Sequence, residues 1–540
     1  MVSIVDHRGR PASKSTSGRW NAALFIIWLE IAERFAYFGV SSNLIIYLTG
    51  PLQESTAAAA AAVNVWSGVG SLSPIVGAIV ADSYLGRFRM LLVASVLFVL
   101  LQGLGLLTLS TVLPGFHPPN CKQTAHDMAC KPTTFQVSVF YFSLSIVALA
   151  QGGYRACALA FGADQFEQND AEESASRSSF FNWWLFGPNI GLIAAFVFLT
   201  YIEENIGWSI GFGICCIVMA ISLIIFLLGI RKYRYHTLEE ESSFARIGKA
   251  ILTLVHSWKA RTRGNCRGDY FSSTEAAEVL VLHEPDPNNY RQMEEAKEVF
   301  RLLPIWTNCL VYAIVFAQSI TFFTKQGKTL DTRIGSNVRL PPAALLSIVS
   351  IAVIVFIPMY EHIIVPLAKR YRKEPLGITM LQRIGIGMAI SIAFMVIAAL
   401  VEKKRLKTAQ EYGLIDQPSA TIPMSLWWLV PQYVLYGISN VFTMVGMQEF
   451  FYDQVPDALR SIGVALAFSA FGIGSILSGF LVLVIDKETR KKGESWFSDN
   501  VNRAHIDYFY WLLAGLSMVG LVIYLFTANL YIYRKKGAKI

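Results

Sequence analysis

The chain has 540 residues, of which 54% are hydrophobic and only 16% are charged, with a net charge of +8. A soluble protein of this length needs more charged surface than this, and the mean hydropathy of +0.45 points to a membrane protein. The modest basic excess fits charged loops beside membrane spans, and nothing in its pattern suggests a nucleic-acid-binding protein.

Apolar segments long enough to cross a hydrocarbon core of about 30 Å recur along the whole chain. In chain order they are expected at Ala22–Leu48, Ala59–Ala81, Met90–Val112, Phe135–Leu159, Phe180–Tyr201, Ile206–Ile230, Phe300–Phe323, Ala343–Leu367, Ile378–Val401, Ser425–Phe450, Ile462–Ile485 and Tyr508–Tyr533. The sequence therefore predicts an all-α, multi-pass membrane protein with about twelve transmembrane helices.

The basic residues in Arg8–Arg19 favour a cytosolic amino terminus, and an even number of spans returns Arg534–Lys536 to the same side. The first span is too long and too charged for a cleaved signal peptide. Two basic clusters, Lys403–Lys407 and Arg490–Lys492, oppose this orientation because they fall on the outside.

A long polar segment, residues 231–298, divides the chain into an amino-terminal half (residues 1–230) and a carboxy-terminal half (residues 299–540). Apolar and basic residues alternate at helical spacing over Phe244–Trp258, which predicts an amphipathic surface helix in this linker. Short basic turns in "VADSYLGRFRM" and "VPLAKRYRKEP" follow the second and eighth spans, as expected of two related halves.

The first span carries three charges, Glu30, Glu33 and Arg34, inside an apolar run. Each such charge costs roughly 2.5–3.5 kcal/mol at the centre of a membrane helix, so the three must face the bundle or a wet cavity. Clustered carboxylates titrate together, so this group can bind and release a proton. The alternative is a static buried ion pair that joins two helices.

The fourth span contains Arg155 in "GGYRACALAFGADQF". Its guanidinium stays charged, so it either pairs with the carboxylates of the first span or holds an anionic substrate. The preceding Gly152 and Gly153 predict a close approach of neighbouring helices.

Other polar and aromatic residues of the spans are weaker candidates, because each is more often a helix-packing residue than a ligand. The residues expected to line a substrate pocket together with Arg155 are Tyr37, Trp306, Tyr312, Phe316, Gln318 and Asn440.

Cys121 and Cys130 share one predicted exterior loop, where a disulfide and two free thiols are both open interpretations. The cysteines inside the spans are expected to be packing residues. No group of Cys and His has the spacing of a metal site, so neither a metal nor another cofactor is expected.

Six segments, "EIAERF", "GAIVADSYLGRF", "AFGADQF", "FFNWW…NIG", "LLPIW" and "VGMQEFFYDQVPDALRSIG", together resemble the plant nitrate and peptide transporter family. This family is the plant branch of the proton-dependent oligopeptide transporters, within the major facilitator superfamily. The resemblance covers nearly the whole chain and implies a major facilitator fold of two six-helix halves. It also implies that Glu30, Glu33 and Arg34, as the E-x-x-E-R motif, couple proton binding to solute movement.

The chain departs from the family pattern at four positions that bear on the solute or on regulation. Arg155 stands where the family commonly has Lys, and Asn440 stands where its peptide carriers have Glu. Phe316 and Met90 replace the His and the phosphorylated Thr of a nitrate carrier of the family. These departures disfavour peptides and favour a larger, partly apolar solute, whereas Arg155 keeps an anion such as nitrate open.

We expect a proton-coupled symporter of a small organic solute or anion, such as nitrate, a hormone or a specialised metabolite. The alternatives are an uncoupled facilitator and a solute sensor that uses the same pocket. The sequence contains no nucleophile with its base, no phosphate-binding loop and no metal motif, so an enzyme is not expected. The expected partners are the solute, protons and the bilayer, for a monomer in the plasma membrane, with the vacuolar membrane as the alternative.

Overall fold

The structure is a computed structural model that describes residues 4–13, 17–99, 133–167, 170–236, 298–334, 338–372, 378–418, 420–455, 460–491 and 493–533. Three predictions lie outside the described residues. They are the amphipathic helix Phe244–Trp258, the state of Cys121 and Cys130, and the later part of the third span.

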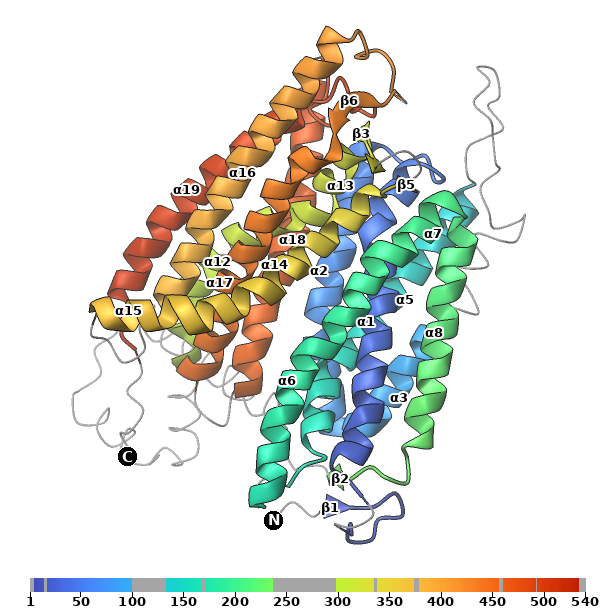
Figure 1. Ribbon diagram of the computed structural model, residues 1–540, viewed down its shortest axis with the longest axis vertical. Helices are drawn as coiled ribbons and strands as arrows, with labels where there is room; N and C mark the ends of the chain where they lie inside the picture. The colour runs from blue at the N-terminus through green and yellow to red at the C-terminus, as the bar shows by residue number, and fades with distance from the viewer. Residues whose placement is uncertain are drawn as a thin grey trace, which may run out of the picture.

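The amino-terminal half is built of long helices (Figure 1). Its helical elements are α1 (Trp20–Thr49), α2 (Thr56–Val80), η1 (Ala81–Leu85), α3 (Arg87–Leu97), α5 (Thr134–Ala163), α6 (Ala171–Ala194), η4 (Ala195–Leu199), α7 (Thr200–Asn205) and α8 (Trp208–Leu228). The strands β1 (Ile4–Val5) and β2 (Tyr235–His236) pair antiparallel at the end of the bundle where α1 begins.

The carboxy-terminal half follows the same plan. Its helical elements are α12 (Leu303–Phe316), η5 (Ala317–Ile320), α13 (Phe322–Gly327), η6 (Pro342–Leu345), α14 (Leu346–Met359), η7 (Tyr360–Ile364), α15 (Val365–Arg372), α16 (Met380–Glu411), η8 (Leu426–Leu429), α17 (Val430–Gln454), α18 (Arg460–Arg490) and α19 (Ile506–Leu530). Its strand pairs join β3 (Leu330–Asp331) to β6 (Ile422–Ser425) and β4 (Arg333–Ile334) to β5 (Val338–Arg339).

The predicted all-α membrane architecture is confirmed, because helices occupy the described part of every predicted span. Eight of the described helical stretches are long and apolar enough to cross a membrane. Two of the spans begin with a capping box, at Thr133 with Gln136 and at Thr379 with Gln382. These local hydrogen bonds satisfy backbone groups at the helix start and fix where each span begins.

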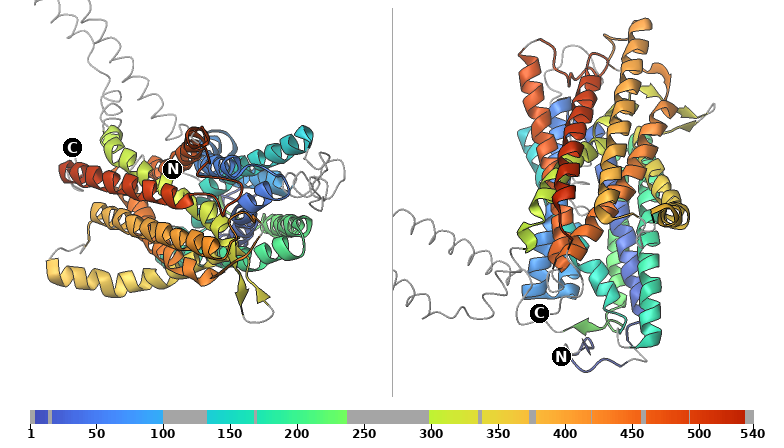
Figure 2. Two further views of the ribbon diagram at one scale, coloured as in Figure 1. Left: turned by 90° about the horizontal axis from the view of Figure 1, so that it is seen from above. Right: turned by 90° about the vertical axis from the view of Figure 1, so that its left-hand side faces the viewer.

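The helices form two groups, coloured blue to green and yellow to red in Figures 1 and 2. The same pairings recur in both: α2 packs on α5 as α14 packs on α17, and α1 packs on α8 as α12 packs on α19. Between the groups, α2 packs along α18. The chain thus has the two related halves of a major facilitator fold.

Hydrogen bonds between the halves lie toward the end away from the start of α1. Lys325 Nζ donates to Thr49 Oγ1 (2.8 Å), Lys328 Nζ donates to Glu204 Oε2 (2.6 Å), and the Thr56 backbone N–H donates to Asp499 Oδ1 (2.8 Å). These contacts close the bundle at this end, which is the outer end in the orientation that the basic loops favour.

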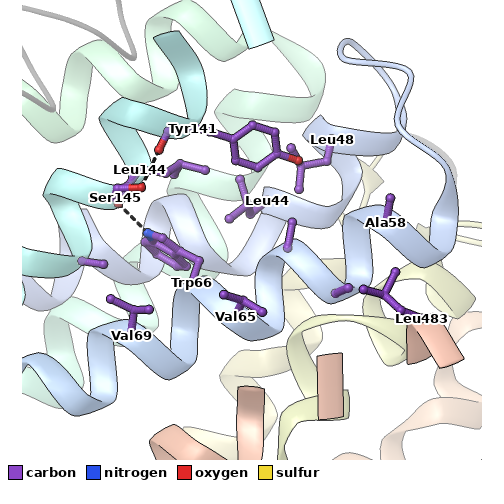
Figure 3. A pocket seen from close by; sticks show the side chains of 13 residues that line it. Leu44, Leu48, Ala58, Val65, Trp66, Val69, Tyr141, Leu144, Ser145 and Leu483 are labelled. Atoms are coloured by element: carbon purple, nitrogen blue, oxygen red, sulfur yellow. Dashed lines mark hydrogen bonds between the residues drawn. The ribbon is translucent and has the colours of Figure 1, made fainter. Parts of the chain in front are cut away.

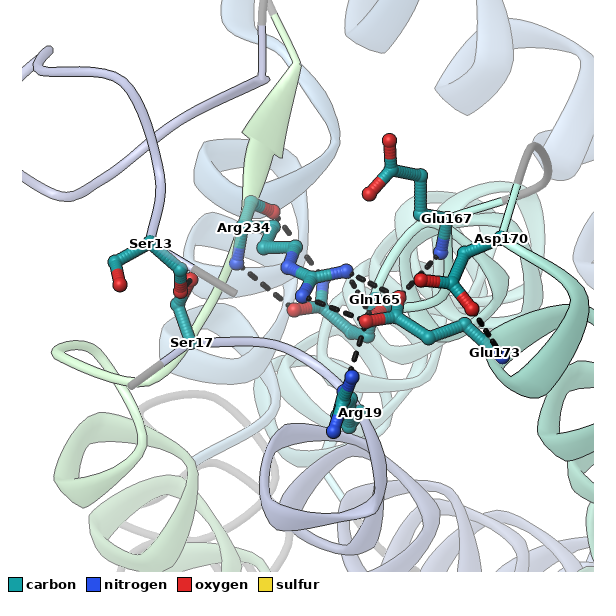
Figure 4. A network of polar contacts seen from close by, with 8 residues as sticks. All are labelled: Ser13, Ser17, Arg19, Gln165, Glu167, Asp170, Glu173 and Arg234. Carbon is teal, nitrogen blue, oxygen red and sulfur yellow. Dashed lines mark hydrogen bonds and ion pairs between the residues drawn. The ribbon is translucent and has the colours of Figure 1, made fainter. Parts of the chain in front are cut away.

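At the opposite end, a buried ionic network ties three chain segments of the amino-terminal half together (Figure 4). The carboxylate of Glu173 accepts hydrogen bonds from Arg234 Nη1 (2.6 Å) and Arg19 Nε (2.8 Å). Gln165 Oε1 accepts from the backbone N–H of Arg234 (2.8 Å). The segment before α1, the connection between α5 and α6 and the segment after α8 are therefore held as one unit.

Candidate functional site

The charged cluster of the first span lies at the middle of α1. Glu30 and Glu33 have 2% and 0% of their surface exposed. Arg34 Nε lies 3.0 Å from Glu30 Oε1 and 3.7 Å from Glu33 Oε2. Glu30 shares a face of the helix with Glu33, three residues on, and with Arg34, four residues on, so the guanidinium that bonds Glu30 also comes near Glu33.

Glu33 is also linked to α5, because Gln151 Nε2 donates to its Oε1 atom (3.2 Å). This contact depends on a close approach of helices. A Cβ atom on Gly70 of α2 would lie 2.9 Å from Gln151 Oε1, and one on Gly152 would lie 2.4 Å from the carbonyl oxygen of Ser73. The close approach predicted from the glycines before Arg155 is thus confirmed at Gly152.

Arg155 sits on α5 one turn beyond Gln151, with its Cζ atom 5.6 Å from the centroid of the Tyr37 ring. The Tyr37 ring stacks on Trp66 of α2, with centroids 4.9 Å apart. Among the described residues, no carboxylate lies within ion-pair distance of Arg155, and its buried Nε atom has no hydrogen-bond partner. The guanidinium therefore makes no ion pair with a described residue, although the carboxylates of Glu33 and Glu30 lie within electrostatic range of it.

The carboxy-terminal half contributes an aromatic cluster from α12, α17 and α18. Phe316 stacks on Tyr436 with ring centroids 5.0 Å apart and meets Phe471 edge-on at the same distance. Tyr312 lies one turn before Phe316, and its hydroxyl accepts a hydrogen bond from Ser439 Oγ (3.3 Å). Three aromatic side chains from different helices thus form one apolar surface.

Gln318 and Asn440 supply the polar groups of this half. Gln318 Nε2 donates to Ser478 Oγ (2.8 Å), and Asn64 Nδ2 of α2 donates to the same hydroxyl (3.3 Å). Gln318 therefore belongs to a junction between the halves. Asn440 Oδ1 on α17 is buried without a hydrogen-bond partner, so its amide can accept a donor from a bound molecule.

The sequence profile described as "PTR2: POT family" matches residues 90–497. The Arabidopsis thaliana protein NRT1/ PTR FAMILY 5.10 is 51% identical, over 99% of this chain and 97% of its own length. The chain belongs to the POT family. Another Arabidopsis thaliana protein, NRT1/ PTR FAMILY 5.14, is 48% identical over 99% of this chain and 97% of its own.

The POT-family fold is also seen in solved structures. The crystal structure of the POT family transporter PepTSo matches with a TM-score of 0.71 at 18% identity, covering 94% of this chain and 98% of that one. An auto-inhibited POT family peptide transporter gives the same TM-score and covers 96% and 99%. These two likenesses show the fold, which is the major facilitator fold that the resemblance implied; together with the family shown by the sequence profile and the Arabidopsis thaliana relatives, the chain is a membrane transporter.

In this POT-family chain, Trp306 lies apart from the aromatic cluster of Phe316. Its indole Nε1 donates to the Leu466 carbonyl and to Ser469 Oγ, both at 3.1 Å. These bonds fix α12 against α18 nearer the start of the span. The contacts that the structure gives Trp306 are those of helix packing.

Three site residues were not predicted: Gln151, Trp66 and Tyr436. Gln151 had a detectable signal, since it is a polar residue inside an apolar span beside Gly152. Trp66 and Tyr436 had none, because an aromatic residue in an apolar span has no sequence feature that separates pocket from packing. Among the described residues, no group of His, Cys, Asp and Glu could hold a metal ion.

A hollow of about 440 Å³ lies between α1, α2, α5 and Leu483 of α18 (Figure 3). Leu44, Val65, Leu144 and other apolar side chains line it, and none of the predicted site residues does. Trp66 is one of its lining residues, and its indole donates to the Leu144 carbonyl (2.7 Å). Through Trp66 the hollow borders the stack on Tyr37, but its apolar lining cannot compensate a charged solute.

Proposed function

We propose that this POT-family chain is a proton-coupled symporter that carries a small organic solute or anion, such as nitrate, a hormone or a specialised metabolite, across a plant membrane. The observation that carries the proposal is the buried pair Glu30 and Glu33, which share one guanidinium in mid-span. When an anionic solute takes up the charge of Arg155, the two carboxylates and Arg34 are left with one negative charge in excess in a low-dielectric site, which one proton neutralises.

The proton site and the proposed solute site are neighbours. Glu33 contacts Gln151, and Arg155 follows Gln151 by one turn of α5. Arg155 carries the charge that an anionic solute needs, while Tyr37, Phe316 and Asn440 offer aromatic surface and an amide acceptor. Binding of an anion at Arg155 and of a proton at Glu33 would therefore support each other electrostatically.

In this proposal, residues 1–230 and 299–540 are the two moving halves, and residues 231–298 link them. Alternating access requires the contacts of Lys325 and Lys328 with the other half to break when the outer end opens. The plasma membrane is the proposed location, and no bound cofactor takes part.

The test is uptake into oocytes from acidic and neutral medium, with nitrate, a dipeptide mixture and a mixture of plant metabolites as separate probes. Acid-driven accumulation of at least one probe is expected, and Glu30→Gln or Glu33→Gln should abolish it. Glu411→Gln is the matched control, because this carboxylate is 57% exposed at the end of α16.

Each result of the uptake test separates the functions. Accumulation in both the Glu30→Gln and the Glu33→Gln variant would contradict the coupling role. Uptake by the wild type that ignores external pH would indicate an uncoupled facilitator, and binding of a probe without flux would indicate a sensor.

A further inference from the structure

A third buried carboxyl group lies near the outer end of the amino-terminal half. Glu203 belongs to α7, the last turns of the fifth span, and only 1% of its surface is exposed. A Cβ atom on Gly211 of α8 would lie 2.3 Å from Glu203 Cγ, so the glycine makes the space in which this side chain lies. The proton-coupled mechanism proposed above makes no use of this group.

Glu203 has no counter-ion among the described residues. The cation of this region, Lys328, is held by the neighbouring Glu204 at 2.6 Å. On the elements packed against α7, the titratable groups are the thiols of α8 (Cys215 and Cys216) and the side chains of α1 (Glu30, Glu33, Arg34, Tyr37 and Tyr47), while η4 and η6 contain none. Arg34 is the cation among these groups, and it is bound to Glu30 and Glu33. None of these groups can compensate an ionised Glu203, and burying an uncompensated carboxylate is costly.

The contact of Glu203 with Asn43 of α1 shows which form of the carboxyl fits. Asn43 Nδ2 donates to Glu203 Oε2 (3.2 Å), while Glu203 Oε1 and Asn43 Oδ1 are both buried without a partner. Both of these atoms are acceptors, so an ionised Glu203 leaves two acceptors unsatisfied. A proton on Oε1 turns that atom into a donor, and its O–H can then bond Asn43 Oδ1.

We propose that Glu203 is a second proton-binding site of this transporter, in which one proton on Oε1 completes a carboxylic acid–amide pair with Asn43. The proton comes from a hydronium ion in solution: one of its O–H bonds breaks to leave water, one O–H bond forms on Glu203 Oε1, and the carboxylate becomes neutral. Two orphan acceptors are satisfied at once, which is the strongest reason for a buried polar pair of this kind to be neutral.

The position of the pair suggests what its proton does. Asn43 lies ten residues beyond Glu33 on α1, about 15 Å along the helix axis. Glu203 precedes Glu204, whose bond to Lys328 joins the halves at the closed outer end. Protonated Glu203 therefore stabilises the closed outer end, and hydration of the pair when this end opens lets the proton exchange with the outside. This role rests on the proposed proton-coupled transport, whereas the protonation itself does not.

Infrared spectroscopy of the purified protein in lipid at neutral pH tests the proposal without any solute. The wild type should show the C=O stretching band of a protonated carboxyl that persists in the Glu30→Gln and Glu33→Gln variants, and Glu203→Gln should remove this band. Glu204→Gln is the matched control, one residue away and ion-paired, and should leave that band in place. Asn43→Leu should shift the band to higher frequency, because the carboxyl loses its amide partner.

Identical spectra for the wild type and Glu203→Gln would overturn the proposal, as would equal loss of the band in Glu204→Gln. If Glu203→Gln does not fold, the frequency shift in Asn43→Leu decides the matter, and a band that does not move counts against the pair. A wild type that shows the band but no acid-driven uptake would contradict the proposed function and leave the proton site standing.

Discussion

Replacing Arg155 by Gln removes a charge from the proposed solute site with little expected damage to the fold. Arg155 has no carboxylate within ion-pair distance among the described residues, so its loss breaks no ion pair there, and Arg34 still holds Glu30 and Glu33. Arg34 is the instructive contrast, because its removal would leave Glu30 and Glu33 without their cation. We therefore expect Arg155→Gln to reach the membrane in normal amounts and to fail in solute binding.

The size of the defect follows from the electrostatics of the site. A guanidinium and a monoanion about 4 Å apart attract each other by about 4 kcal/mol at an effective dielectric constant of about 20. Desolvation of both groups offsets part of this, which leaves about 2–3 kcal/mol. The apparent affinity for an anionic solute should therefore fall by about 30- to 150-fold.

The assay is the concentration dependence of uptake for an anion that the wild type carries. Arg155→Gln should raise its KM by the stated factor, whereas a neutral solute, if one is carried, should keep its KM. Arg333→Gln is the control, since Arg333 is a cation 67% exposed at the outer end. An unchanged KM for every anion in Arg155→Gln would refute the assignment of this residue to the solute.

Two further predictions concern the peptide preference and the inner ionic network. Asn440 offers no charge for the ammonium group of a peptide, and an unpaired buried charge costs several kcal/mol. Dipeptides at millimolar concentration should therefore neither inhibit uptake nor be carried. Measured dipeptide uptake would contradict this prediction. Burial raises the pKa of Glu173, but hydrogen bonds from Arg234 and Arg19 outweigh it and lower the pKa from 4.5 to about 2. Because its pKa is depressed in the folded state, Glu173 stabilises the protein above about pH 4.5. Glu173→Gln should therefore lower the free energy of unfolding at neutral pH by about 1–3 kcal/mol, and this difference should vanish as pH falls toward 2. Equal melting temperatures of the two proteins at neutral pH would argue against the prediction.

The membrane fold could be predicted from the sequence because the cost of burying backbone and charge in lipid leaves few alternatives. Runs of apolar residues therefore indicated the spans, and Glu30 and Glu33 indicated the site because a charge inside a span costs free energy. Arg155 was found for the same reason, but the sequence did not show which group it pairs with. The sequence left open whether it pairs with those carboxylates, and only the geometry shows the absence of an ion pair among the described residues.

Residues that act through a neighbour on another helix were beyond prediction. Gln318 and Trp306 remain predicted pocket residues, but the sequence did not reveal their contacts: the Gln318 amide bonds Ser478 at the junction of the halves, and the Trp306 indole bonds the Leu466 carbonyl of α18. In each case the side chain's role depends on the rotation of one helix against another, which hydrophobic pattern alone does not fix.

The helix α1 connects the two proton sites that we propose. It runs without interruption from Trp20 to Thr49 and carries both Glu33 and Asn43. A continuous helix moves as one body, so a shift that admits water to the pair of Asn43 and Glu203 also displaces Glu33 relative to Gln151 on α5. Protonation at the outer end and at mid-span would then be coupled through one rigid element whose equilibrium position both sites bias, which is the physical requirement for linking two sites. This coupling gives a reason for the polar groups that the first span carries at two depths. The pair of Asn43 and Glu203 exchanges protons with the outside, and Glu33 couples the resulting movement of α1 to the solute.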